Sequence, residues 1–461
     1  MPLTSTKSAD VFLHVPRDVS IPTDRPSRRA GAPFRSKPTK TVTLVFFIPG
    51  NPGLISYYHP FLDLLAKRLG KQQRQDRWQD RQAVITAGLS LGGFDVAQNG
   101  GDHDDDHDDD QSAAEEKKKK KKKMRELMYP SSGSHRGIDD GGGGGANNNN
   151  SNNNRIYSLK DQIELCYARV QSLCGMIREE YHGRLDEGEK GRTGPDGVKV
   201  ILVGHSVGTY ICLEMVRLWH ERRLPEKEHG GSSKHEREEP TWTVSNCILL
   251  TPTIVDLHSS ASGRIATPLL TSVPFVSGCV PGLAQLLVHA VVVKSVLPAH
   301  WLRGFVKKVT GMEEGGHGLD STMAFLESQS GVRQALSMAA DELREIRADR
   351  WGDEVWGAAV DEDEGDATTS TTPRDEGERN GNAENRKCPP RMYLWFAKED
   401  HWIADMTRTD ILRNRGQRAT GQQRGPTIVI DETEGLVHAW CLEQSEMVAA
   451  QVGRWLEEIM E

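Results

Sequence analysis

Residues 198–218 read VKVILVGHSVGTYICLEMVRL and place an apolar run, a glycine-flanked turn and a run of helical length in direct succession. The run at 198–203 has the length and continuous apolar character of a strand buried on both faces. Between it and the helix expected at 209–219, GHSVG (204–208) matches G-x-S-x-G. That turn is so tight that it needs both glycines, and it holds the serine in a strained conformation with its hydroxyl exposed. We therefore predict that Ser206 is a nucleophile.

A second match to the same pattern, GLSLG, lies at residues 88–92. A short strand precedes it, but the chain continues into GFDVAQNGGDHDDD, which is not a helix. Without a helix, Ser90 lacks both the helix dipole and a backbone N–H in position to stabilise negative charge. We predict that Ser90 is a loop residue.

The rest of the chain alternates strands with helices. Apolar runs of strand length occur at 42–48, 83–87, 244–250, 392–396 and 427–430, and helical periodicity occurs at 56–69, 159–176 and 443–459. Continuous apolar strands separated by helices predict an α/β protein whose central sheet is mostly parallel, with helices on both faces.

An acid is expected after the strand RMYLWF (391–396), because a carboxylate at the end of that strand can orient an imidazole and stabilise its charged form. The chain reads AKEDHW from residue 397 to residue 402. We predict Asp400 as this acid, with Glu399 and Asp405 as alternatives.

A base is expected last, since enzymes with this strand–turn–helix arrangement have the order Ser, acid, His. His438 lies in the loop at 431–438, between the last predicted strand and the last predicted helix, and is our predicted base. His401 comes too early in this order.

The oxyanion hole needs two N–H groups, one from the residue after the nucleophile and one from the loop after the first core strand. The first group belongs to Val207. The loop is PGNPG (49–53). Pro52 has no N–H, so Asn51 is the predicted second donor, although an ordinary Pro/Gly turn would contain the same residues.

Bulk composition separates core-forming segments from polar tracts. The chain has 461 residues, 36% of them hydrophobic, and a net charge of -8 from nearly balanced acids and bases, so we expect no nucleic-acid partner. Three segments (1–40, 94–154 and 357–388) are too polar to bury a core and are predicted to be disordered. The Asp/His run (102–110) and the Lys run (117–123) are interpreted as solvated insertions rather than as a metal site or a nuclear or anionic-lipid signal.

The seven cysteines are odd in number, scattered and without CxxC spacing, which indicates a reducing compartment. The polar N-terminal segment lacks the apolar core of a signal peptide, so we expect a protein that faces the cytosol. We also expect no metal ion and no cofactor, since acyl transfer through a serine requires neither.

Several motifs together resemble the lipid droplet-associated hydrolase family. They are PGNPG with the Tyr57, Tyr58 and Phe61 that follow it, SLKDQIELC (158–166), GHSVGTY (204–210), LLTPTI (249–254), MAADELREI (338–346), DHW (400–402) and GLVHAW (435–440). The resemblance covers about residues 42–92, 156–350 and 390–460. It implies an α/β-hydrolase fold in residues 41–461, a triad of Ser206, Asp400 and His438, and a location on lipid droplets with a cytosolic or endoplasmic reticulum pool.

A cap or lid is expected at 256–350, after the strand that follows the nucleophile helix. Within it, residues 265–293 contain no Asp, Glu, Lys or Arg. That length could span a bilayer, but three prolines interrupt it. We therefore expect a segment that enters one leaflet and returns, or an apolar lid; the alternative is a buried pair of cap helices.

The predicted function is a serine esterase or lipase that cleaves a neutral-lipid ester, a sterol ester or an acylglycerol, at a lipid-droplet monolayer or endoplasmic reticulum surface. Two alternatives stay open at this point. One is a lipid-droplet protein that keeps the fold with little turnover, and the other is a hydrolase of a peptide or thioester bond.

Overall fold

The structure is a computed structural model. It describes residues 3–16, 41–74, 82–96, 122, 124–130, 155–182, 197–223, 242–271, 281–282, 284–286, 299–357, 390–416, 426–431 and 435–461.

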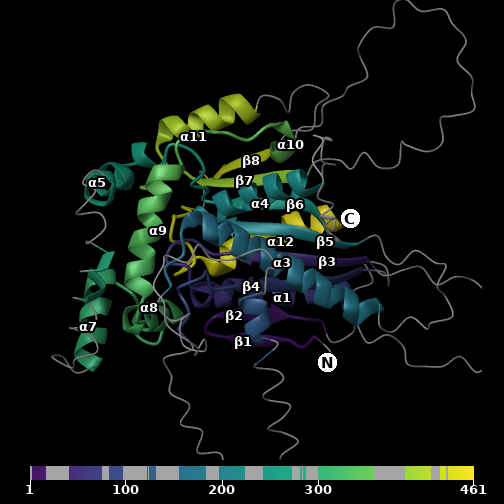
Figure 1. The fold of residues 1–461 in the computed structure, drawn as a ribbon, viewed down its shortest axis with the longest axis horizontal. Helices are drawn as coiled ribbons and strands as arrows, with labels where there is room; N and C mark the ends of the chain where they lie inside the picture. Colours follow the sequence, from purple (N-terminus) through teal and green to yellow (C-terminus); the bar gives the residue numbers. More distant parts are fainter. Residues whose placement is uncertain are drawn as a thin grey trace, which may run out of the picture.

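A single mixed sheet organises the fold (Figure 1), with strand order β1-β2-β4-β3-β5-β6-β7-β8. The strands are β1 (Thr6–Ser8), β2 (Val11–His14), β3 (Thr41–Ile48), β4 (Gln82–Leu89), β5 (Val198–His205), β6 (Trp242–Leu250), β7 (Arg391–Ala397) and β8 (Thr427–Asp431). From β4 to β8 every neighbouring pair is parallel, whereas β1 and β2 are antiparallel additions at one edge. This order, with a G-x-S-x-G turn after β5, is that of an α/β-hydrolase fold, as predicted.

Helices cover both faces of the sheet (Figure 1). α1 (His59–Arg74) packs against α12 (Ser445–Met460), and α3 (Leu159–His182) packs against α4 (Val207–Arg223). Shorter elements are η2 (Ile55–Tyr58), η5 (Leu257–Ser259), α10 (Asp353–Trp356), α11 (Asp405–Ile411) and the π-helical turn η6 (Leu412–Gly416).

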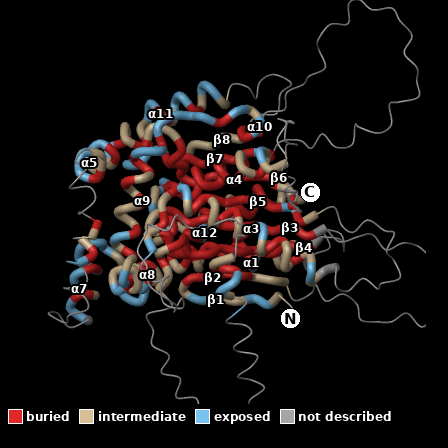
Figure 2. The backbone as a smooth tube through the Cα atoms, viewed as in Figure 1, coloured by how far each residue is buried: buried red, intermediate tan, exposed pale blue. Residues whose placement is uncertain are grey.

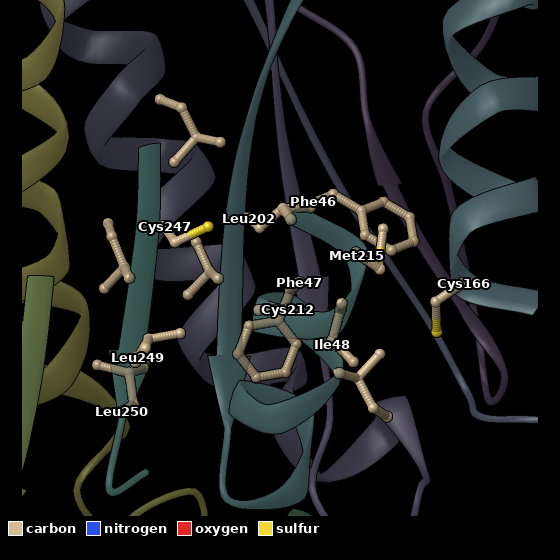
Figure 3. Packing of buried hydrophobic residues seen from close by; sticks show 14 of the residues in the cluster. Phe46, Phe47, Ile48, Cys166, Leu202, Cys212, Met215, Cys247, Leu249 and Leu250 are labelled. Carbon is tan, nitrogen blue, oxygen red and sulfur yellow. The ribbon is translucent and has the colours of Figure 1, made fainter. Parts of the chain in front are cut away.

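Apolar side chains of neighbouring strands and helices form one core between the sheet and these helices (Figures 2 and 3). Figure 3 shows Phe46 and Phe47 of β3, Leu202 of β5, and Cys212 and Met215 of α4 in this core. The predicted parallel strands are buried along almost their whole length, because helices cover them on both sides. The five described cysteines are free buried thiols.

The prediction that residues 1–40 are disordered was wrong at the N-terminal end. β2 pairs with β4, and Val11, Phe12 and Leu13 are buried. The buried Asp10 accepts a hydrogen bond from Ser90 Oγ, which fixes the β1–β2 hairpin to the end of β4. Two strands of three and four residues give little periodicity, and their stability depends on pairing with β4, which is distant in sequence.

The insertion at 94–154 is also ordered in part. Phe94, Leu127 and Met128 are buried, and the fully buried Arg169 of α3 donates hydrogen bonds to the backbone oxygens of Met128 and Ser90, each at 2.8 Å. Residues 94–96 and 124–130 are therefore part of the fold, contrary to the prediction. The Asp/His run, the Lys run except Lys122, and nearly all of the tract at 357–388 lie outside the described residues.

Between β6 and β7, the helices α5 (Ala261–Leu270), α7 (Ala299–Thr310), α8 (His317–Glu327) and α9 (Gly331–Glu345) lie beyond the carboxyl end of the sheet (Figure 1). This is the region where a cap is expected. Of the charge-free segment at 265–293, only 265–271, 281–282 and 284–286 are described, and Ile265, Leu269 and Leu286 in it are exposed. Among the described residues, no helix is both long enough and apolar enough to cross a bilayer.

Candidate active site

Ser206 occupies the sharp turn between β5 and α4, with φ of 52°, in the left-handed region that a serine rarely adopts. The two glycines of the motif are required by close packing. A Cβ on Gly204 would lie 2.6 Å from the Gly208 oxygen, and one on Gly208 would lie 2.3 Å from the Ile48 oxygen. The sequence therefore forces the chain through this turn and leaves the Ser206 hydroxyl at the carboxyl edge of the sheet.

A chain of hydrogen bonds connects Ser206, His438 and Asp400. His438 Nε2 lies 2.9 Å from Ser206 Oγ, and His438 Nδ1 lies 2.8 Å from Asp400 Oδ2. A carboxylate can only accept, so Nδ1 carries the proton, and Nε2 is free to accept the serine proton. The Asp400 side chain is only 1% exposed, and its second oxygen accepts a hydrogen bond from Trp402 N at 2.8 Å.

The alternative acids and the second histidine lie elsewhere. Glu399, Asp405 and His401 are exposed, and Asp405 begins α11, where it pairs with Arg408. The structure therefore brings Asp400, and none of these three, to the imidazole of His438.

Ser90 is a fully buried residue that follows β4 directly. Its hydroxyl accepts a hydrogen bond from Ile55 N and donates one to Asp10 Oδ1, each at 3.1 Å. This environment holds Ser90 in a structural role, in agreement with the expectation that the second G-x-S-x-G match is not a nucleophile elbow.

The loop after β3 lies directly against Ser206, since a Cβ on Gly50 would be 3.1 Å from the Cβ of Ser206. Gly50 N already donates to the hydroxyl of Tyr58 at 3.1 Å, and Pro52 has no N–H. Val207 is the first residue of α4. Asn51 and Val207 therefore remain the predicted oxyanion donors.

Sequence reasoning assigned no role to His205, which is buried beside Ser206. Its Nε2 lies 2.8 Å from the backbone oxygen of His438, and its Nδ1 lies 2.7 Å from the Tyr58 hydroxyl. Burial lowers the pKa of His205 to about 3, so this imidazole is neutral. Because a carbonyl oxygen only accepts, Nε2 carries the proton, and Nδ1 accepts from Tyr58. The sequence feature that could have indicated this contact is the Tyr-Tyr pair that follows PGNPG, since Tyr58 is the partner of His205.

Glu342 of α9 was also missed, although it lies in a motif of the family resemblance. It is buried at the candidate site and accepts a hydrogen bond from Asn51 Nδ2 at 2.9 Å. Burial raises the pKa of this carboxyl group to about 8. No periodicity argument distinguishes it from the exposed acids on the same helix.

Ser206 and His438 open onto a cavity of about 770 Å³. Its walls are largely apolar and come from the cap region and from the loops at the carboxyl edge of the sheet; they include Tyr57, Ile265, Leu269, Leu343, Trp402 and Leu442. Neither Lys nor Arg occurs among the described residues that line it. Among all the residues that the structure describes, no group of three or more His, Cys, Asp or Glu residues is arranged to hold a metal ion.

The family model for lipid-droplet associated hydrolases matches residues 41–441. The chain belongs to this family. Its fold, with the mostly parallel sheet and the G-x-S-x-G turn after β5, is the α/β-hydrolase fold. The matched range includes Ser206, Asp400 and His438, and every motif that suggested the family except SLKDQIELC contributes residues to the site just described.

Curated relatives in this family match over a short segment. The lipid droplet-associated hydrolase of Pongo abelii is 38% identical over 76 residues, which are 16% of this chain and 17% of that protein. The human lipid droplet-associated hydrolase is 37% identical over a segment of the same size. The alignment thus spans less than a fifth of each relative.

Solved structures with a similar overall arrangement are more distant. A thermophilic esterase from Thermogutta terrifontis covers 92% of each chain at 10% identity, with a TM-score of 0.36. The haloalkane dehalogenase DbeA from Bradyrhizobium elkani covers 98% of this chain and 99% of its own at 10% identity, with a TM-score of 0.39. Both are too distant to bear on the chemistry of this member of the family.

Proposed function

We propose that this hydrolase cleaves carboxylic esters of neutral lipids through a covalent acyl-enzyme on Ser206. The observation that carries the proposal is the hydrogen-bonded series Ser206–His438–Asp400 at the base of an apolar cavity of about 770 Å³. A nucleophile, a base and an acid that orients the base are the groups that acyl transfer to a serine requires.

In the first half of the reaction, Ser206 Oγ attacks the ester carbonyl carbon while His438 Nε2 accepts the hydroxyl proton. The carbonyl oxygen becomes an oxyanion, which the N–H groups of Val207 and Asn51 stabilise. When the intermediate collapses, the bond to the alcohol oxygen breaks, and His438 returns its proton to that alcohol. Asp400 stays ionised and stabilises the imidazolium.

In the second half, water attacks the acyl carbon and His438 accepts one of its protons. The new tetrahedral intermediate expels Ser206 Oγ, which takes the proton back from His438. The products are a free fatty acid and the regenerated serine. Atoms and charge balance over both halves, and no cofactor takes part.

The cavity supports a neutral and apolar substrate. Transfer of an acyl chain from water to apolar cavity walls lowers its free energy. Because the described lining contains neither Lys nor Arg, the site offers no cation to a phosphate or carboxylate headgroup. Sterol esters and acylglycerols, which are uncharged, fit this chemistry.

The surface around the cavity supports a lipid-droplet or endoplasmic reticulum surface as the partner. Ile265 and Leu269 of α5 are 77% and 57% exposed, and they also line the cavity. Trp301, Phe305 and Val309, four residues apart on one face of α7, are each more than 60% exposed. Figure 2 shows that exposed positions recur along α5 and α7. A patch of this kind on a protein surface marks an interaction site, and the relatives named above are called lipid droplet-associated.

Labelling with a fluorophosphonate probe, followed by a substrate panel, tests the proposal. The wild-type protein should label at Ser206 and hydrolyse sterol or acylglycerol esters, while Ser206→Ala does neither and Ser90→Ala labels normally. Labelling that survives in Ser206→Ala would contradict the nucleophile. Labelling at Ser206 with turnover confined to peptide or thioester substrates, or with no turnover, would contradict the substrate class.

A further inference from the structure

The side chain of Asn51 is held by α9, a helix more than 280 residues away in the sequence. Asn51 Nδ2 donates to the backbone oxygen of Ala335 and to Glu342 Oε1, each at 2.9 Å. Ala335 and Glu342 are seven residues apart, which is two helical turns, so both acceptors lie on the same face of α9. One amide group therefore joins the loop after β3 to this helix at two points.

α9 is itself fixed to the core of the domain. The Gln334 side chain accepts a hydrogen bond from Tyr157 N and donates one to Tyr157 O, both at 2.8 Å. The helix packs on α3 on the core side and on α5 and α8 in the cap region. Asn51 is thus tied to a rigid element that contacts both the sheet-covering helices and the cap.

The Glu342 carboxyl has no part in the relay of Ser206, His438 and Asp400. It lines the cavity, yet its side chain is buried and its Oε1 is engaged by Asn51. Burying a carboxyl group among apolar side chains carries a free-energy cost, and the hydrogen bond to Asn51 offsets only part of it. A buried acid at this position calls for a role that an apolar side chain would not fill.

We propose that Glu342 is a positioning residue for the oxyanion hole: by fixing the side chain of Asn51, it fixes the direction of the Asn51 N–H. The inference rests on the proposed acyl-transfer function. Oxyanion donors act on charge that develops only in the transition state, and their effect depends on placement within a few tenths of an ångström. A misplaced Asn51 should therefore lower kcat and leave KM nearly unchanged.

Two substitutions of Glu342 distinguish the effect of its hydrogen bond to Asn51 from the effects of its charge and its side-chain volume. Glu342→Gln keeps an acceptor oxygen for Asn51, whereas Glu342→Leu has a similar size and removes it. The matched controls are Glu345→Gln and Glu345→Leu, on an exposed position of the same helix. Assayed on a soluble p-nitrophenyl ester, Glu342→Leu should lose about 10–100-fold in kcat with KM within about twofold. Glu342→Gln should stay within about threefold of wild type at pH 7, and both Glu345 variants should match wild type.

Asn51→Ala provides a second route, which is needed if Glu342→Leu does not fold. It removes the donor to both Glu342 Oε1 and the Ala335 backbone oxygen and retains the Asn51 N–H, so it should lose at least as much kcat as Glu342→Leu. The double variant with Glu342→Leu should lose little more than Asn51→Ala alone, because Asn51→Ala already removes the hydrogen bond to Glu342.

The outcomes distinguish this inference from the proposed function. A Glu342→Leu variant with wild-type kcat, or a Glu342→Gln variant as impaired as Glu342→Leu, overturns the positioning role while Ser206-dependent turnover stands. If wild type turns over no ester, the proposed function fails, and the rate of fluorophosphonate labelling, which also needs the oxyanion hole, still tests Glu342. Absence of labelling in wild type contradicts both.

Discussion

His205 donates a hydrogen bond from Nε2 to the backbone oxygen of His438 over 2.8 Å. Its other nitrogen accepts from Tyr58, whose hydroxyl in turn accepts from Gly50 N. His205, the residue before Ser206, therefore connects the loop of the predicted base to the loop of the predicted oxyanion hole. The bonds that Tyr58 makes with Gly50 and His205 are buried, and the bond from His205 to His438 is partly buried. Buried hydrogen bonds are the most costly to leave unmade.

Tyr58→Phe tests this connection. The change leaves Gly50 N and His205 Nδ1 without their partner, and each unsatisfied buried group costs about 1–3 kcal/mol. We expect a lower Tm and a kcat reduced by roughly tenfold, measured by calorimetry and by ester hydrolysis. Tyr57→Phe is the matched control, because it loses a 2.8 Å hydrogen bond to Thr322 that leads away from the relay. Equal kcat losses in the two variants would argue against a role for the His205 connection.

Asp400→Asn should abolish most activity and leave the fold intact. The asparagine can hold the imidazole in the wrong tautomer and carries no charge to stabilise the imidazolium, so we expect kcat to fall by about 10³–10⁴-fold. Glu399→Gln and Asp405→Asn, which change exposed acids, should retain wild-type kcat. Steady-state assays of the three variants compare them directly. An Asp405→Asn variant as inactive as Asp400→Asn would reverse the assignment of the acid.

Glu342 should give the stability of the protein a recognisable pH dependence. Burial raises the pKa of its carboxyl group from 4.5 to about 8 in the folded state. Between these pH values the folded protein keeps a proton that the unfolded chain has lost, so the contribution of Glu342 to stability falls as pH rises from 4.5 to 8. The Tm of wild type should therefore decline relative to that of Glu342→Gln across this range. A constant difference in Tm between the two proteins from pH 5 to pH 8 would contradict the raised pKa of Glu342.

The sequence predicted the parallel strands and the nucleophile turn because these features depend on local pattern. VKVILV is buried on both faces, and GHSVG has glycines that its own backbone requires. Asp400 and His438 followed from chain order, although only the folded chain shows which of three nearby acids faces the imidazole. β2, Arg169, His205 and Glu342 act through partners distant in sequence, and no local periodicity reports such contacts.

The insertion at 94–154 tests how far composition alone predicts which residues pack in the core. From composition alone, deleting residues 100–152 should be harmless, but the structure places Leu127 and Met128 in the core and binds the Met128 oxygen to Arg169. We now expect this deletion to lower Tm by several degrees, since it leaves Arg169 buried with one partner fewer. Deleting only 131–154, which keeps residues 124–130, should change Tm little. Equal thermal unfolding curves for wild type and the longer deletion would contradict the packing role.

Membrane association should depend on the exposed apolar faces near the cavity. On α7, Phe305 is 63% exposed, whereas Leu302 is 7% exposed and packs with α8. Leu286, in the charge-free segment, is 65% exposed, while Val276 of that segment lies outside the described residues. If Phe305 and Leu286 enter a lipid monolayer, an aspartate at either site costs roughly 2.5–3.5 kcal/mol on insertion scales.

Phe305→Asp and Leu286→Asp should therefore leave the protein folded and reduce its flotation with artificial droplets of triacylglycerol coated by phosphatidylcholine. Their hydrolysis of a soluble ester should stay near wild type, because neither residue lines the cavity. Leu302→Asp is the contrasting variant: a charge among buried side chains should lower Tm or cause aggregation. If Phe305→Asp and Leu286→Asp still float with the droplets, these faces are not the contact, and the Lys run at 117–123 becomes the next segment to substitute.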